Sequence, residues 1–127
     1  MTNATQEVER RKDRRVLLNG RADAVLFGPD FTKGVQIVDV SSSGLAFRYV
    51  DGQKMIDGPL ELDILWDHMD VFLLNLKMEA ISDFQLANEF LLGVIPIRRC
   101  GVEFVNLTVD QLSQLENLME KSETLDA

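Results

Sequence analysis

Apolar and polar residues alternate along most of the chain in short stretches, with turn-forming residues between them. In one such stretch, Leu45, Phe47 and Tyr49 occupy every second position. A period of two is typical of a β-strand that buries one face. The same reasoning predicts further strands at residues 15–18, 21–27, 35–38, 60–66, 71–81 and 100–105. A mainly β domain is therefore expected.

The part of the chain around residues 71–92 is less regular. In the strand expected at 71–81, the apolar residues assigned to the inner face are Phe72, Leu74, Leu76 and Met78. Residues 83–92 fit either a strand or a helix, and both alternatives stay open. Pro96 argues against a central strand position next to this segment, because proline cannot donate a hydrogen bond to a neighbouring strand.

The C-terminal part of the chain has the pattern of an amphipathic helix. Thr108 is followed three positions later by Gln111, the spacing of a capping box. Apolar residues then recur at helical spacing at Leu112, Leu115, Leu118 and Met119. About six short strands followed by one such helix predict a small antiparallel barrel with a helix packed on it.

Length and composition restrict the class of protein. With 127 residues, 46% of them hydrophobic, the chain has the size and apolar content of one globular domain. The first nine residues are polar and are expected to be a flexible leader without an apolar signal segment. Cys100 is the single cysteine, so an intrachain disulfide is excluded, and we expect a small buried thiol. A cytoplasmic protein is expected, with no membrane insertion.

The charge of the chain is distributed very unevenly. The formal net charge is −8, which argues against a general DNA-binding or RNA-binding protein. Six of the 13 basic residues but only one of the 21 acidic residues lie in residues 10–21. This segment therefore carries a charge of +5 and the rest of the chain a charge of −13. The sequence predicts an acidic body with one basic arm.

Arginines within this arm are spaced four apart, as Arg10 and Arg14 and as Arg11 and Arg15. Guanidinium groups present forked donors to phosphate oxygens or to the O6/N7 edge of guanine, and their planes stack on bases. Several of them at one chain terminus can surround a compact anion. The alternative is a solvated basic segment that pairs with the acidic body.

A polar segment, Asp39-Val40-Ser41-Ser42-Ser43-Gly44, separates two of the expected strands and is predicted to be a turn. The carboxylate of Asp39 can accept hydrogen bonds from paired N–H donors such as those on the Watson–Crick edge of guanine. Ser41 adds a hydroxyl, and Gly44 permits a backbone path that a Cβ would block. The alternative is an Asx or Ser turn that only links two strands.

Together these two segments resemble the paired signature of the PilZ domain family. Arg11-x-x-x-Arg15 is followed after 23 residues by Asp39-x-Ser41-x-x-Gly44. The resemblance extends to the start of the next strand at Gly44-Leu45-Ala46-Phe47 and to the stretch Cys100–Leu107 before the helix, and covers about residues 9–121. It implies a six-stranded antiparallel β-barrel with a C-terminal α-helix. It also implies a receptor for the bacterial second messenger cyclic di-GMP.

The domain boundaries follow from the resemblance together with the patterns above. Residues 1–9 form the leader and residues 10–127 one PilZ domain. Within the domain we expect the arginine arm at 10–15, the barrel at 16–107 and the helix at 108–121.

The resemblance assigns the ligand-binding residues Arg11, Arg15, Asp39, Ser41 and Gly44. The arm is implied to fold over the ligand, and its ordering to pass the signal to a downstream protein partner. Arg10 stands just before the first arginine, where in family members an Arg accompanies an intercalated ligand dimer, so two ligands per site are expected. The pair Arg10 and Arg14 has the same spacing; Arg11 and Arg15 are preferred because Arg15 directly precedes a strand-like stretch.

Other functions have less support in the sequence. Asp67, His68 and Asp70 provide too few fixed ligands for a metal site and are expected at a hairpin tip. The single His has no nucleophile at a motif spacing, so neither catalysis nor a cofactor is expected.

The main alternative is a PilZ-like adaptor that binds a protein and not the nucleotide. An RNA-binding barrel is disfavoured by the acidic body, and homo-oligomerisation through the outer face of the helix stays open.

Overall fold

The computed structural model describes residues 14–18, 22–50, 58–66 and 71–126. Within these residues, seven strands precede one helix, in the order β1 (Val16–Leu17), β2 (Asp23–Phe27), β3 (Thr32–Val40), β4 (Gly44–Val50), β5 (Pro59–Trp66), β6 (Val71–Leu91), β7 (Ile95–Phe104) and α2 (Val109–Asp126). The leader, Arg10, Arg11 and the expected hairpin tip at residues 67–70 lie outside the described residues.

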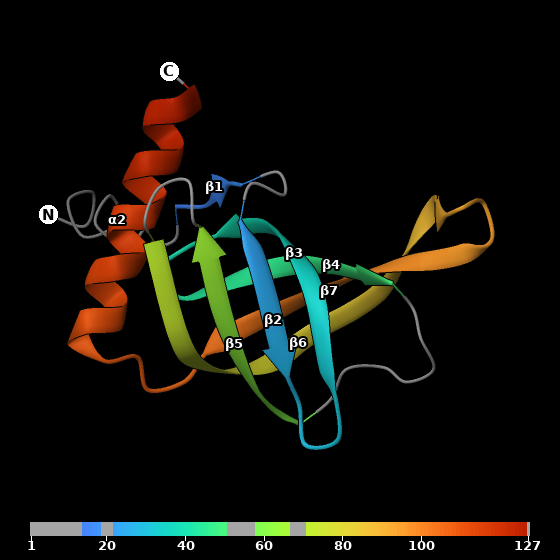
Figure 1. Cartoon of the computed structure of the whole chain (residues 1–127), viewed down its shortest axis with the longest axis horizontal. Helices are drawn as coiled ribbons and strands as arrows, with labels where there is room; N and C mark the ends of the chain where they lie inside the picture. The colour runs from blue at the N-terminus through green and yellow to red at the C-terminus, as the bar shows by residue number, and fades with distance from the viewer. Residues whose placement is uncertain (1–13, 19–21, 51–57, 67–70, 127) are drawn as a thin grey trace, which may run out of the picture.

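Six of the strands form a closed antiparallel barrel (Figure 1). The strand order is β3-β2-β5-β6-β7-β4, and β4 pairs with β3 to complete the circle. β1 adds a short seventh strand along residues 39–40 of β3, beyond the part of β3 that pairs with β2. The six-stranded antiparallel β-barrel with a C-terminal helix is therefore confirmed. Closure removes the unpaired edges that a six-stranded open sheet would present.

Inward-facing side chains of the strands fill the barrel. The expected alternation at Leu45, Phe47 and Tyr49 is confirmed, since all three are buried. The core continues through the other strands and the helix, and its fully buried large side chains are Phe47, Leu18, Leu26, Ile37, Leu45, Leu62, Ile64, Leu73, Leu76, Met78, Leu115 and Leu118. Cys100 is also fully buried, as expected.

The inner face of β6 differs from the prediction. Leu74 is 51% exposed, and its neighbour Leu73 is buried instead. Between the pairs Leu62–Leu76 and Ile64–Leu73, β6 contains one residue more than β5, which makes a β-bulge. Asn75 adopts a positive φ of 60° there and donates its backbone N–H to the carboxylate of Asp63 at 2.9 Å. An extra residue moves the following side chains to the opposite face, which simple alternation does not take into account.

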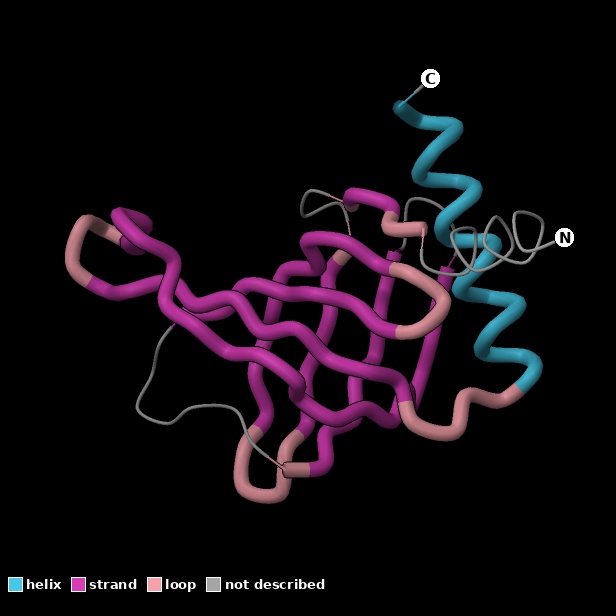
Figure 2. Tube along the Cα trace, turned by 180° about the vertical axis from the view of Figure 1, so that it is seen from behind, coloured by secondary structure: helices cyan, strands magenta, loops and turns pink. Residues whose placement is uncertain are grey.

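The distal parts of β6 and β7 extend beyond the barrel as a hairpin (Figures 1 and 2). Residues 83–91 belong to strand β6, which settles the choice between strand and helix. Leu92 and Gly93 turn the chain with positive φ values. Pro96 lies opposite Phe90, just past the last residue of β7 that pairs with β4. Its position is consistent with the expectation that proline avoids a central strand.

Helix α2 packs against β6 and β1 through Leu115, Leu118 and Met119. The predicted capping box is confirmed: Gln111 donates its N–H to the hydroxyl of Thr108, and the N–H of Thr108 donates to the Gln111 side chain, both at 3.0 Å. The helix ends at Asp126, five residues later than expected. Within the described residues, no helix is long and apolar enough to cross a membrane.

Candidate functional site

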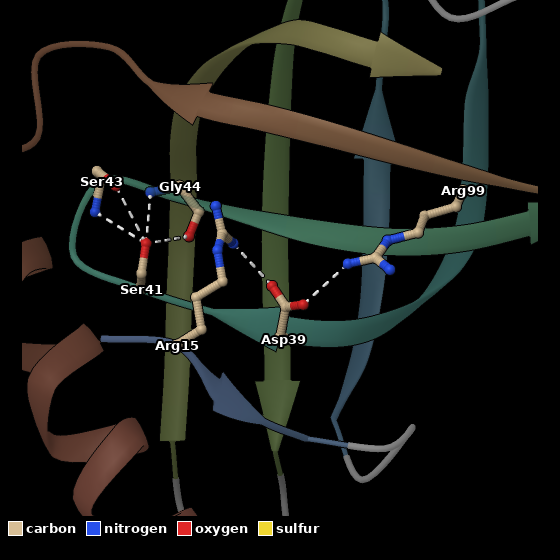
Figure 3. A network of polar contacts seen from close by, with 6 residues as sticks. All are labelled: Arg15, Asp39, Ser41, Ser43, Gly44 and Arg99. Atoms are coloured by element: carbon tan, nitrogen blue, oxygen red, sulfur yellow. Dashed lines mark hydrogen bonds and ion pairs between the residues drawn. The ribbon is translucent and has the colours of Figure 1, made fainter. Parts of the chain in front are cut away.

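Pairing of β1 with β3 brings the basic segment to the polar segment that follows β3. Val16 lies opposite Val40 and Leu17 opposite Asp39. Arg15, the residue before β1, therefore lies beside Asp39 although the two are 24 positions apart in the sequence. Of the predicted site residues, the described ones Arg15, Asp39, Ser41 and Gly44 all belong to this one region (Figure 3); Arg10 and Arg11 lie outside the described residues.

Asp39 is part of strand β3 and not of a turn, and a β-bulge determines where it points. Ile37 pairs with Phe47 and Asp39 pairs with Ala46, so β3 contains one residue more than β4 in this interval. Without the extra residue, Asp39 would share the inward orientation of Ile37. The bulge turns the carboxylate to the outer face of the barrel, a common use of bulges beside functional sites.

The carboxylate of Asp39 is held between two arginines (Figure 3). Arg15 Nη1 donates to Oδ1 at 2.8 Å, and Arg99 Nη2 donates to Oδ2 at 3.0 Å. Asp39 is only 5% exposed, whereas the side chains of Arg15 and Arg99 are 52% and 38% exposed. Charge-assisted hydrogen bonds to both oxygens offset the cost of burying a carboxylate.

Arg99 is a site residue that the sequence patterns did not predict. It belongs to β7 and approaches Asp39 from the opposite side to Arg15. Its neighbour Arg98 instead donates to Asp83 and to the hydroxyl of Tyr49. Alternation with the buried Cys100 and Val102 places Arg98 on the inner face of β7 and Arg99 on the outer face. The sequence pattern does not show that pairing of β7 with β4 brings Arg99 next to Asp39.

Ser41 organises the segment between β3 and β4. Its hydroxyl accepts the backbone N–H groups of Ser43 and Gly44 at 3.3 Å and donates to the carbonyl of Gly44 at 3.2 Å. The backbone N–H of Ser41 donates to the same carbonyl at 2.8 Å, and Ser43 accepts the N–H of Phe104 at 2.9 Å. Ser41 is almost fully buried. These contacts fix the segment against the end of β7.

Gly44 lies against the backbone of β7. A Cβ built on Gly44 would lie 2.1 Å from the carbonyl oxygen of Val102. A side chain there would force β4 and β7 apart. The glycine of the motif therefore has a packing role in the barrel itself.

Arg14 points to a different part of the molecule from Arg15. Its guanidinium pairs with Glu123 of helix α2 at 3.0 Å. Of Arg14 and Arg15, only Arg15 contacts Asp39, which it shares with Arg99 of β7. Arg14, a member of the alternative pair Arg10 and Arg14, contacts helix α2 instead.

Cys100 shows no feature of a reactive thiol. Burial, followed by the negative charge of Asp83, raises the pKa of Cys100 to about 12. A thiol of this kind is not a thiolate near neutral pH and is a poor nucleophile. Among the described residues, no group of three His, Cys, Asp or Glu could hold a metal ion.

Comparison with known proteins gives structural but not sequence matches. No model of a known protein family and no curated protein matches the sequence. Among solved structures, the PilZ domain of YcgR from Escherichia coli with c-di-GMP is similar over 89% of this chain and 91% of that chain, with a TM-score of 0.70 and 12% identity. The chain has a PilZ-type fold.

Two further PilZ structures are larger than this chain. MrkH of K. pneumoniae, a c-di-GMP-dependent transcription regulatory factor, matches with a TM-score of 0.64 and 14% identity. PlzA of Borreliella burgdorferi in complex with c-di-GMP matches with a TM-score of 0.59 and 10% identity. The match covers 89% and 99% of this chain, but it spans only 50% of MrkH and 58% of PlzA.

Proposed function

We propose that this chain is a receptor for cyclic di-GMP. The contact between Arg15 and Asp39 carries the proposal, because it joins the second arginine of one motif to the carboxylate of the other. Similar folds in structures with c-di-GMP support the same ligand class. The chain is a signal receptor in this proposal and not an enzyme.

Asp39 and the arginines have complementary roles in binding. The paired N–H donors on the Watson–Crick edge of one guanine replace a guanidinium at the carboxylate of Asp39. Arg15, released from Asp39, and Arg11 then contact phosphates and guanine through their forked donors. Ser41 and Gly44 keep the strand-connecting segment in the shape that presents Asp39.

Ordering of the arm is the proposed signal to a downstream protein. The residues next to the site are already tied to helix α2, through Arg14 with Glu123 and through the carbonyl of Leu17 with the hydroxyl of Ser122. A ligand that draws Arg15 away from Asp39 therefore acts on a segment that also contacts the helix. In this proposal, the downstream partner binds to helix α2 together with the arm that the ligand has ordered.

Isothermal titration with cyclic di-GMP tests the proposal. We expect Arg11→Ala and Arg15→Ala to abolish measurable binding and to leave the fold intact. Asp39→Ala is expected to weaken binding by about 1–3 kcal/mol, the usual range for a hydrogen bond to a charged group. Arg21→Ala removes the same charge from the same basic segment outside the motif, so it serves as the matched control.

Stoichiometry tests the proposed role of Arg10. Two ligands per chain in the unaltered protein and one in Arg10→Ala would support an intercalated ligand dimer. Unchanged affinity in either Arg11→Ala or Arg15→Ala would contradict the receptor proposal.

A PilZ-like adaptor without nucleotide binding is the second candidate function. The observation in its favour is the hairpin of β6 and β7, whose end exposes Phe90, Leu91, Leu92 and Val94. Exposed apolar residues that cluster in this way are typical of protein interaction sites. Absence of any heat of binding with cyclic di-GMP would favour this candidate.

A further inference from the structure

A cavity lies next to the Arg15–Asp39–Arg99 cluster, on the outer face of the barrel. Its volume is about 260 Å³, and both arginines line it. The residues beneath it are Ala46 of β4, Gly101 of β7 and Ser82 of β6, which lie opposite one another across the three strands. All three side chains are short, and the hydroxyl of Ser82 lies over Gly101, with its Oγ 2.6 Å from the position of a Cβ there. A flat group in the cavity would therefore rest on this hydroxyl and on Ala46.

Phe84 lines the same cavity on the side of β6. It lies directly opposite Arg99 in the pairing of β6 with β7, and directly opposed side chains on one face of a sheet are close neighbours. Phe84 is 49% exposed and is not among the residues of the hydrophobic core. The ring is therefore available to a ligand.

A β-bulge in β6 gives Phe84 this orientation. Ala80 pairs with Val102 and Ser82 pairs with Gly101, so Ile81 is an extra residue of β6. The bulge shifts the alternation, so that Asp83 faces the buried Tyr49 and Phe84 faces outward. A bulge on β3 has the same effect on Asp39. The two bulges direct an aromatic ring and a carboxylate to the same face of the barrel.

The charge of the cluster suits an anion beside the ring. Two guanidinium groups share one carboxylate, so Arg15, Asp39 and Arg99 together carry one net positive charge. Arg99 is part of β7, which pairs with β4 on one side and β6 on the other. The cavity thus combines an exposed aromatic face with a fixed guanidinium, and both groups stack on nucleobases.

We infer that Phe84 and Arg99 are additional ligand-contacting residues, and that they hold one purine base of the nucleotide by stacking. This inference rests on the proposed function and adds two residues that belong to neither the arginine motif nor the Asp-x-Ser-x-x-Gly motif. In it, Phe84 provides the aromatic surface. Arg99 covers the base or its phosphate with a planar cation while it keeps Asp39 in position.

Substitution of Phe84 provides the first test, by titration with cyclic di-GMP. Stacking of a base on an aromatic side chain corresponds to an affinity loss of roughly 5- to 150-fold on replacement by Ala. We expect a loss in this range for Phe84→Ala. Phe90→Ala is the matched control, because Phe90 is 44% exposed on the same strand and does not line this cavity. Equal affinities of Phe84→Ala and the unaltered chain would overturn the assignment of Phe84.

Fluorescence gives a readout that depends on direct contact. Phe84→Trp is expected to retain affinity and to show quenched emission when cyclic di-GMP is added, because the indole stacks on guanine. Phe90→Trp also contains a second tryptophan besides the native Trp66, but outside the cavity. Its emission is expected to be quenched no more than that of the unaltered chain when cyclic di-GMP is added. Full binding without quenching in Phe84→Trp would place the base elsewhere.

Arg99 is tested by two substitutions. Arg99→Ala is expected to weaken binding at least tenfold, and Arg99→Lys is expected to remain weak because lysine keeps the charge but lacks the plane. Arg48→Ala is the control: Arg48 lies opposite Arg99 on β4, its side chain is 36% exposed, and it does not line this cavity. Full rescue by Arg99→Lys would overturn the stacking role.

The outcomes separate this inference from the proposed function. An unaltered chain that binds cyclic di-GMP, together with full affinity in the Phe84 and Arg99 variants, overturns the inference alone. An unaltered chain that does not bind overturns the proposed function and the inference with it. Thermal unfolding of the Phe84 variants is expected to match that of the unaltered chain, because Phe84 is half exposed and lies outside the core. Arg99→Ala removes one partner of the buried Asp39 carboxylate, so this variant is expected to unfold at a lower temperature and is compared at a temperature where it is fully folded.

Discussion

Gly44 begins β4 at a point where the backbone of β7 occupies the space of a side chain. The nearest atom to a methyl group added at Gly44 would be the carbonyl oxygen of Val102, which cannot move without distortion of the strand pair. Asp39 and Ser41 differ from Gly44 in this respect, since their side chains make specific polar contacts. Loss of function after substitution of Gly44 is therefore expected to reflect a damaged barrel.

We predict that Gly44→Ala lowers the free energy of unfolding by about 1–3 kcal/mol or more, the usual cost of an overpacked site. Gly34→Ala is the matched control, because no atom lies within 4 Å of a Cβ at Gly34 in β3. The control is expected to change stability by no more than about 1 kcal/mol. Urea unfolding measures both, and equal effects would contradict the packing role of Gly44.

At the scale of elements, helix α2 is connected to β1 and not only to the barrel. Ser122 is fully buried and donates its hydroxyl to the carbonyl of Leu17 at 3.1 Å. The ion pair between Arg14 and Glu123 lies next to it, but both of its side chains are about half exposed. Exposed ion pairs contribute little to stability, so the buried hydrogen bond of Ser122 is the stronger connection.

We predict that Ser122→Ala loosens β1, because the carbonyl of Leu17 loses a buried partner at a cost of about 1–3 kcal/mol. Amide hydrogen exchange of the peptide containing residues 14–18 is expected to accelerate. Ser113→Ala is the control, since Ser113 lies on the exposed side of the same helix. Equal exchange rates in the two variants would show that α2 does not restrain the arm through Ser122.

For the molecule as a whole, a buried polar cluster inside the barrel influences stability at alkaline pH. The hydroxyl of Tyr49 donates to the carboxylate of Asp83 at 2.7 Å, and Arg98 donates to the same carboxylate at 3.0 Å. Burial, and then the hydrogen bond to Asp83, raises the pKa of Tyr49. The cluster joins β4, β6 and β7 at the base of the projecting hairpin.

We predict that Tyr49 makes its full contribution to the free energy of unfolding below pH 10. Above pH 10 this contribution decreases as the pH rises. The unfolded chain releases the phenolic proton near pH 10, whereas the native state retains it, so rising pH favours unfolding. Tyr49→Phe is expected to be less stable at pH 7, by about 1–3 kcal/mol, because Asp83 loses a partner. The difference should narrow above pH 10.

Urea unfolding of both proteins from pH 7 to pH 11 measures this difference. Tyr49 is the only tyrosine, so tyrosinate absorbance reports its ionisation directly. A stability difference that stays constant up to pH 11 would contradict the raised pKa.

Much of the fold could be predicted from the sequence, because strand alternation and helix capping are local. The inward positions of Leu45, Phe47 and Tyr49 and the capping box at Thr108 depend only on residues a few positions apart. The inner face of β6 could not be predicted in the same way. The bulge at Asn75 shifts the alternation, and a bulge exists only relative to the strand it pairs with.

The candidate site was predictable as far as its motif residues. Arg15, Asp39, Ser41 and Gly44 were assigned from the resemblance to the PilZ family, and the described structure brings all four into one region. Arg99 and Phe84 belong to no motif. They join the site because β7 and β6 pair beside β4, which is a property of the closed barrel.

The sequence by itself determined an acidic, mainly β domain with one basic arm and a C-terminal helix, since composition, alternation and capping are properties of neighbouring residues. Only the tertiary structure decided that Asp39 points outward, that Arg15 and Arg99 share its carboxylate, and that Phe84 lies beside them. The physical reason is that β-bulges and barrel closure determine which face each side chain occupies and which residues it contacts. These contacts join residues far apart in the sequence, such as Asp39 and Arg99, which are 60 positions apart.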